Sequence, residues 1–145
     1  MLSSIIYKIM KYGGNMKEVY EFLKKCGIFY IATIDGEKPR VRPFGVVNIY
    51  EGKLYIQTGK IKNVSKQIQK NPNIEICGFL DNKWLRVEAK AIRDDRIEAK
   101  KSMLDANPTL RSMYDENDDN TEVLYFTSTK ATFSSFTEPP RIVEF

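Results

Sequence analysis

The chain has 145 residues, about one domain's worth, and with 42% apolar and 12% aromatic residues it has the composition of a soluble globular protein. The sequence contains no histidine, which excludes Ser/His and Cys/His nucleophile pairs, a histidine general base and every zinc site with a histidine ligand. The net charge of +4 is uneven, because residues 1–70 hold 13 basic and 5 acidic side chains whereas residues 71–145 hold 10 and 14. This asymmetry favours a local anion site over a uniformly basic nucleic-acid surface.

The first predicted element is a helix that follows an N-terminal appendage over residues 1–15. Gly13-Gly14 separates the appendage from a domain over residues 16–145. Apolar residues recur at helical spacing from Val19 to Cys26, and Gly27 ends the helix. Neither the appendage nor the rest of the chain has the pattern of a secretory signal or a membrane span, so a cytoplasmic protein is expected.

The next segment predicts a hairpin, a third strand and a short helix. A β-branched and aromatic strand over residues 28–34 leads through Asp35-Gly36 to a return strand over residues 41–50, and a third strand covers residues 54–58. A loop at Gly59 opens into a helix over residues 63–70, which stops before Pro72 because the residue before a proline disfavours helical geometry.

The second half of the chain predicts three further strands and one helix. The strands cover residues 74–80, 83–93 and 123–133, and the middle one alternates strictly between apolar and charged residues. A helix over residues 94–106 has Asp94 at its N-cap. Six strands in consecutive hairpins with peripheral helices predict an α+β fold built on a closed antiparallel barrel.

The two cysteines lie far apart in the sequence and in no Cys-x-x-Cys pair. Cys26 and Cys77 are therefore interpreted as small buried hydrophobes in a reducing compartment. Two cysteines without histidine also make no metal site, so chemistry is expected from a bound cofactor or from Lys, Tyr, Asp or Glu.

The first segment that favours anion binding is Lys38-Pro39-Arg40-Val41-Arg42-Pro43-Phe44. Arg40 and Arg42 are two positions apart on a strand and project to one face, where two guanidinium groups repel each other unless an anion lies between them. The flanking prolines suit an edge strand. The alternative is an ordinary solvated pair of arginines.

The second such segment runs from Gln57-Thr58 through Gly59 into the helix that starts at Asn63. Free N–H groups and the positive end of the helix dipole can hold a phosphate there, with Lys60 or Lys62 adding charge. The spacing is not that of a Walker P-loop. Lys62, Lys66 and Lys70 recur at i, i+4, which is also typical of a solvated helix face.

These motifs together resemble the FMN-binding split barrels related to pyridoxamine 5'-phosphate oxidase, and within them the small proteins akin to nitroimidazole-resistance flavoproteins. The resemblance covers residues 16–145. It is carried by the order of five motifs: Gly-Ile-Phe-Tyr-Ile-Ala-Thr at 27–33, Pro-Arg-Val-Arg-Pro-Phe at 39–44, Leu-Tyr-Ile-Gln-Thr-Gly at 54–59, Trp-Leu-Arg-Val-Glu at 84–88 and Phe-Ser-Ser-Phe at 133–136.

The resemblance implies a six-stranded antiparallel split β-barrel that binds FMN at a homodimer interface. It places Arg42 at the start of the FMN-binding strand, with residues 43–47 continuing along the flavin ring, and Lys62 and Asn63 in the phosphate loop. Trp84 replaces a glutamine that reaches the flavin from the partner subunit. The implied cofactor-binding residues are Arg40, Val41, Arg42, Pro43, Gln57, Thr58, Lys62, Asn63 and Trp84, with no metal ligand and no catalytic residue assigned.

Two classes of function follow from the resemblance. The first is an oxidoreductase that passes electrons from NAD(P)H through FMN to a small acceptor such as a nitro compound, and the second is a flavin-binding carrier, sensor or stress-related protein without turnover. Pyridoxamine phosphate oxidation is not expected, because the oxidase's C-terminal substrate segment has no counterpart. A single-strand nucleic-acid-binding barrel is the third and least favoured reading, and neither a nucleic-acid nor a membrane partner is expected. A deazaflavin or haem in place of FMN stays open.

Overall fold

The computed structural model describes residues 15–145, so the predicted appendage over residues 1–15 lies outside the described residues except for its last position. A helix occupies residues 15–26 and ends at Gly27, whose positive φ of 72° is the conformation that favours glycine at this position. Val19 and Leu23 are the fully buried residues of this helix, at the spacing expected for one face. The first helix is therefore confirmed.

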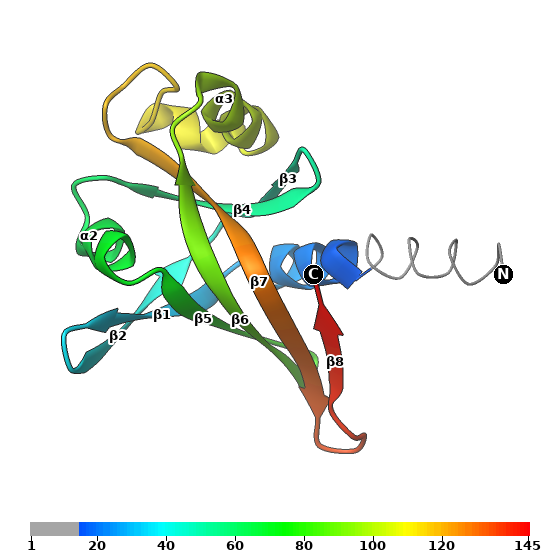
Figure 1. Cartoon of the computed structure of the whole chain (residues 1–145). Coiled ribbons are helices and arrows are strands. Elements are labelled where there is room, and N and C mark those ends of the chain that lie inside the picture. The colour runs from blue at the N-terminus through cyan, green and yellow to red at the C-terminus, as the bar shows by residue number, and fades with distance from the viewer. Residues whose placement is uncertain (1–14) are drawn as a thin grey trace, which may run out of the picture.

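The rest of the described chain forms one antiparallel sheet of eight strands with helices beside it (Figure 1). The strands are β1 (Phe29–Asp35), β2 (Lys38–Phe44), β3 (Asn48–Tyr50), β4 (Lys53–Gly59), β5 (Asn73–Leu80), β6 (Lys83–Asp94), β7 (Thr121–Ser135) and β8 (Arg141–Glu144). The helices are α2 (Asn63–Lys70), α3 (Ile97–Ala106) and the 3-10 helix η1 (Pro108–Ser112). The α+β class and the antiparallel split barrel are confirmed.

The sheet order explains why the barrel is split and why it has more strands than predicted. The order is β2-β1-β5-β6-β7-β4-β3, with β8 on β7, and no ladder joins β2 to β3 within residues 15–145. The segment 41–50, predicted as one strand, leaves β1 after Phe44 and joins β4 from Asn48. The chain must cross from one edge to the other at this point, so a single strand over 41–50 was wrong, as was a barrel closed by pairing. The short β8 was not predicted.

The core lies inside the curved sheet and follows the predicted alternation. Leu85, Val87, Ala89 and Ala91 of β6 are buried whereas the charged residues between them are exposed. Burying each large apolar side chain contributes roughly 1.5–3 kcal/mol. Helix α2 covers one end of this core with Val64 and Ile68, and it contacts both β1 and β4.

Asp94 does not cap α3, which corrects the prediction from the sequence. The helix begins at Ile97, and Asp94 is the last residue of β6. Its carboxylate accepts hydrogen bonds from the Arg96 backbone N–H at 3.1 Å and from the Tyr55 hydroxyl at 2.8 Å, and it pairs with the Arg96 guanidinium at 2.9 Å. These bonds, led by that to the Arg96 guanidinium, lower the pKa of Asp94 to about 2. Asp94 thus ties β4 to the start of α3.

The cysteines are both free, and the prediction that they are buried was wrong for both. Cys26 is half-buried and its Sγ lies 3.8 Å from the carbonyl oxygen of Phe79. Cys77 is exposed, because it lies on the outer face of β5 beside Tyr30 of β1. Among residues 15–145, none of the helices has the length and apolar character needed to cross a membrane.

Candidate functional site

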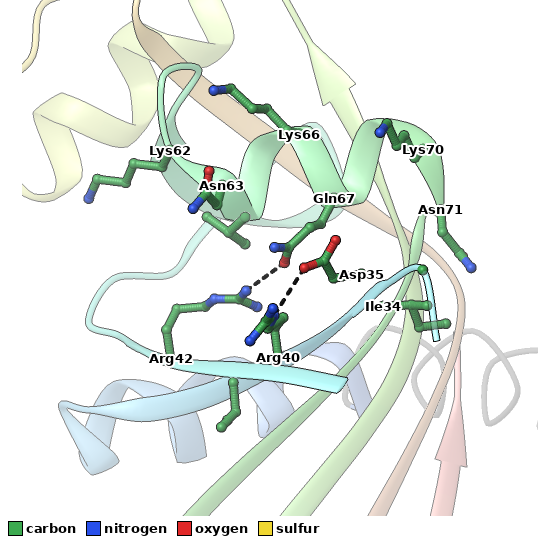
Figure 2. A pocket seen from close by; sticks show the side chains of 13 residues that line it. Ile34, Asp35, Arg40, Arg42, Lys62, Asn63, Lys66, Gln67, Lys70 and Asn71 are labelled. Carbon is green, nitrogen blue, oxygen red and sulfur yellow. Dashed lines mark hydrogen bonds and ion pairs between the residues drawn. The ribbon is translucent and has the colours of Figure 1, made fainter. Parts of the chain in front are cut away.

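A cleft lies between β2 and α2, where the two predicted anion-binding segments meet (Figure 2). Its volume is about 1080 Å³. The lining residues come from the β1–β2 hairpin and from α2 with its flanking residues: Ile34, Asp35, Gly36, Arg40, Val41, Arg42, Lys62, Asn63, Val64, Lys66, Gln67, Lys70 and Asn71. Five of these side chains are basic and one is acidic, so the cleft is strongly cationic.

Arg42 is held in a fixed orientation by neutral acceptors. Its Nη1 donates to the carbonyl oxygen of Ile31 at 3.2 Å and to Oγ1 of Thr33 at 2.7 Å, and its Nη2 donates to Oε1 of Gln67 at 2.7 Å. The same Gln67 oxygen also accepts from Thr33, at 2.5 Å, which fixes the amide itself. A guanidinium has five N–H donors, so Nε–H and one Nη2–H of Arg42 are left for a ligand.

The Arg42 charge is not neutralised within the described chain. No carboxylate of residues 15–145 forms an ion pair with it, and the side chain is half-buried. Burial, together with the neighbouring Arg40, lowers the pKa of Arg42. A partly desolvated cation with two free donors is the arrangement that an anion would stabilise by charge-assisted hydrogen bonds.

The N-terminus of α2 lies beside Arg42 in the cleft. Lys62 is the N-cap residue, and no side chain caps the helix. The backbone N–H groups of Asn63 and Val64 donate to no backbone carbonyl of another segment within residues 15–145. Free N–H groups, the helix dipole and the Lys62 ammonium therefore supplement Arg42 at this end of the cleft.

Asn120 fixes the loop that leads into α2. Its carbonyl oxygen accepts from Lys60 N at 2.8 Å and its Oδ1 accepts from Ile61 N at 3.1 Å. A Cβ at Gly59 would lie only 2.9 Å from Nδ2 of Asn120, so glycine permits this close approach. Asn120 is the last residue of the acidic segment 115–120, so this segment, which precedes β7, sets the position of the loop.

The structure brings five of the nine predicted site residues into the cleft. Arg40, Val41, Arg42, Lys62 and Asn63 line it, and β2 is an edge strand as its prolines indicated. Four others are not in its lining: Pro43, which is exposed, Gln57 and Thr58, which are buried, and Trp84.

Gln57 and Trp84 have distinct surroundings. Both amide atoms of Gln57 are buried and have no hydrogen-bond partner among the described residues. Trp84 is half-buried at the start of β6, and its ring packs against Phe136 with centroids 5.1 Å apart. Within one copy of the chain, Trp84 takes no part in the cleft.

Gln67, Thr33 and Asn120 are the site residues that the sequence did not indicate. Gln67 and Asn120 act through contacts with residues at least 25 positions away, so no local pattern reveals them. Thr33 lies nine positions from Arg42, across the β1–β2 hairpin. The i, i+4 spacing of Lys66 and Lys70 was the one available signal, and both residues line the cleft.

Comparison with known families finds one that covers most of the chain. The model of the family described as "Pyridoxamine 5'-phosphate oxidase" matches residues 16–134. No functionally curated protein matches the chain.

Solved structures with the same fold differ widely in sequence identity. A NimC/NimA family protein from Clostridium acetobutylicum is 43% identical, with a TM-score of 0.90 and coverage of 93% of this chain and 95% of that one. General Stress Protein 26 from Bacillus anthracis is 16% identical, with a TM-score of 0.71 and coverage of 92% and 98%. HutZ, a haem storage protein from Vibrio cholerae, is 15% identical, with a TM-score of 0.60 and coverage of 77% and 87%. The last two likenesses show the fold alone.

Proposed function

Since this chain belongs to the pyridoxamine 5'-phosphate oxidase family, we propose that it binds FMN in the cleft between β2 and α2 and works as an oxidoreductase. Electrons would come from NAD(P)H and go to a small acceptor such as a nitro compound. The observation that carries the proposal is Arg42, a fixed guanidinium with two free donors and no carboxylate partner in the described chain.

The residues present fit the phosphate of FMN. A phosphate monoester carries a charge of about −1.5 to −2 at neutral pH, which the charges of Arg42 and Lys62 balance. Asn63 and Val64 add backbone N–H groups at the positive end of α2. The flavin ring then extends along residues 43–47, the link by which the chain crosses from β2 to β3.

The cleft favours a flavin over haem. HutZ is described as a haem storage protein, and haem iron in proteins is held by His, Cys, Met or Tyr. This chain has no histidine, and the cleft lining contains no Cys, Met or Tyr.

The chemistry that FMN supplies when bound is hydride acceptance from a nicotinamide and electron delivery to an acceptor. The chain's own residues bind and orient the cofactor. Arg42, fixed by Thr33 and Gln67, sets where the phosphate sits without rearrangement on binding.

The proposal includes a second copy of the chain, because the outer face of the sheet carries large exposed apolar side chains that a partner would cover. Tyr30 of β1 is 51% exposed and Phe79 of β5 is 60% exposed, and Trp84 lies opposite Phe79. Contiguous apolar surface of this kind is typical of an interface. We therefore expect a homodimer, with Trp84 contacting the partner's flavin site. Light scattering at micromolar concentration that gives 16.8 kDa, the mass of one chain, would contradict the dimer.

Three measurements on the purified protein test the function. Reconstitution with FMN should give a flavin absorption spectrum, and anaerobic NADH or NADPH should bleach it. Steady NAD(P)H oxidation with a nitroaromatic acceptor identifies an enzyme. A bound flavin that neither nucleotide bleaches would refute the oxidoreductase and leave a flavin-binding carrier or sensor. A protein that takes up no flavin would refute both.

A further inference from the structure

The cleft continues well beyond the residues that would hold the FMN phosphate. Figure 2 shows Arg42, Lys62 and Asn63 at one end, and Ile34, Lys70 and Asn71 at the other, next to the β1–β2 hairpin. The volume of about 1080 Å³ is slightly above the ~300–1,000 Å³ that small-molecule sites occupy. The part of the lining that would not hold the FMN phosphate, which we call the outer cleft, includes Asp35, Arg40, Lys66 and Lys70.

The outer cleft has an excess of positive charge. Arg40 donates from Nε to Asp35 at 3.0 Å, which neutralises one cation. Lys66 and Lys70 have no acidic partner within residues 15–145. They lie one turn apart on α2, where like charges destabilise a helix slightly unless an anion lies between or beside them. Two uncompensated charges therefore remain after Arg42 and Lys62 have balanced one phosphate.

The position of the outer cleft shows which part of a ligand it would meet. In the proposed function the flavin ring extends from Arg42 toward residues 43–47. Arg40 is two residues before Arg42, so it lies ~7 Å away along β2 in the opposite direction. Lys66 and Lys70 lie ~6 and ~12 Å beyond Lys62 along the axis of α2. FMN ends at its phosphate, so it leaves the outer cleft unused.

We propose that the outer cleft binds a second phosphate group, located on the far side of the first phosphate from the flavin ring. This inference rests on the proposed function for the direction of the flavin. A second phosphate of this kind has two sources. It belongs either to a flavin dinucleotide, whose diphosphate continues past the first phosphate, or to a separate nucleotide that binds beside FMN. In both cases Lys66 and Lys70 are the recognising residues.

The test is calorimetric titration of the full chain and of a double variant, Lys66→Gln with Lys70→Gln. The matched control replaces two exposed lysines of the N-terminal helix, Lys17→Gln with Lys24→Gln, and loses the same charge. The titrants are FMN, FAD, ADP added to FMN-loaded protein, and inorganic pyrophosphate added to cofactor-free protein. Circular dichroism confirms that each variant is folded.

We expect FAD affinity to fall roughly tenfold in the Lys66/Lys70 variant, with FMN affinity changed less than about twofold. If the Lys66/Lys70 variant instead loses affinity for ADP while its affinity for FAD is unchanged, the inference is supported and the second phosphate belongs to a separate nucleotide. If FMN weakens as much as FAD, the lysines hold the first phosphate and the inference is wrong. It is also wrong if neither FAD nor ADP responds.

The pyrophosphate titration separates this inference from the proposed function. A chain that binds no flavin refutes the function. Pyrophosphate affinity that depends on Lys66 and Lys70 still supports the phosphate site in that case, whereas pyrophosphate affinity equal in the variant and the control overturns it.

Discussion

Changing Gln67 to glutamate tests whether the unneutralised charge of Arg42 is what holds the cofactor. The amide oxygen of Gln67 accepts from Arg42 at 2.7 Å and from Thr33 at 2.5 Å. A carboxylate oxygen accepts both bonds with the same geometry. Gln67→Glu therefore keeps the shape of the site and supplies Arg42 with the anion that the described chain does not provide.

The expected magnitude follows from the geometry of one guanidinium shared by two anions. Anions on two edges of the group lie ~5–6 Å apart and repel each other by ~3 kcal/mol at an effective dielectric constant of ~20. Solvent screening reduces this to ~1–3 kcal/mol, which corresponds to FMN binding weakened roughly 5- to 150-fold. The free energy of unfolding should not fall, because Arg42 gains a charged partner.

The assay is quenching of flavin fluorescence on binding to cofactor-free protein, combined with urea unfolding. Gln69→Glu is the control, because Gln69 lies on the exposed side of the same helix and the change adds the same charge. Equal FMN affinity in the two variants would refute the reasoning, because it would mean that charge at Arg42 is irrelevant to binding. A large loss of stability in Gln67→Glu would show instead that the amide group is needed for folding.

Three further predictions concern stability and the dimer. The pKa of Asp94 is lowered from its ordinary value of 3.8 to about 2. The contribution of Asp94 to the free energy of unfolding is therefore fully present above pH 3.8 and is lost as the pH falls toward 2. Tyr55→Phe removes one hydrogen-bond donor to the Asp94 carboxylate, so this variant should unfold in acid at a higher pH than the wild type. The control Tyr125→Phe should keep the acid-unfolding midpoint of the wild type. Gly59→Ala should lower the free energy of unfolding in urea by ~1–3 kcal/mol, because the new Cβ meets Asn120. The control Gly45→Ala, whose Cβ has only ordinary contacts at 3.6 Å, should be nearly neutral. Equal losses of stability in the two variants would refute the close approach at Gly59. Trp84 fluorescence should be strongly quenched in the FMN-loaded dimer and recover on cofactor removal, and identical emission in the two states would leave Trp84 as an interface residue only.

The fold was largely predictable because its periodic patterns are local. The alternation in β6 and the Asn71-Pro72 stop of α2 are set by neighbouring residues, and both were predicted correctly. The break after Phe44 was not predictable in this way. It arises because β2 pairs with β1 while β3 pairs with β4, and this choice of partner is decided by the whole sheet. Asp94 was misassigned for a similar reason, since its carboxylate bonds to Tyr55 in β4, 39 positions away.

In the candidate site, too, only the residues that local sequence patterns set could be predicted. Arg40 and Arg42 could be placed on one face from their spacing, and Lys62 and Asn63 from the glycine loop and helix start. Gln67 could not be placed beside Arg42, because it reaches Arg42 only when α2 packs against β1. Thr33 reaches Arg42 across the β1–β2 hairpin, but nothing in the hairpin sequence marks it as an acceptor for that guanidinium. The outer cleft could not be predicted, because it forms only where the β1–β2 hairpin and α2 lie side by side, although the spacing of Lys66 and Lys70 was evident in the sequence.

The most direct test of the central claim is FMN titration of the wild-type chain beside Arg42→Gln and Lys62→Gln. The wild type should saturate at one FMN per chain and show a flavin spectrum. Each variant should bind FMN roughly 10- to 150-fold more weakly, since each loses a charge-assisted hydrogen bond worth ~1.5–3 kcal/mol. Dissociation constants that stay unchanged in both variants would contradict the placement of the cofactor phosphate between Arg42 and the N-terminus of α2.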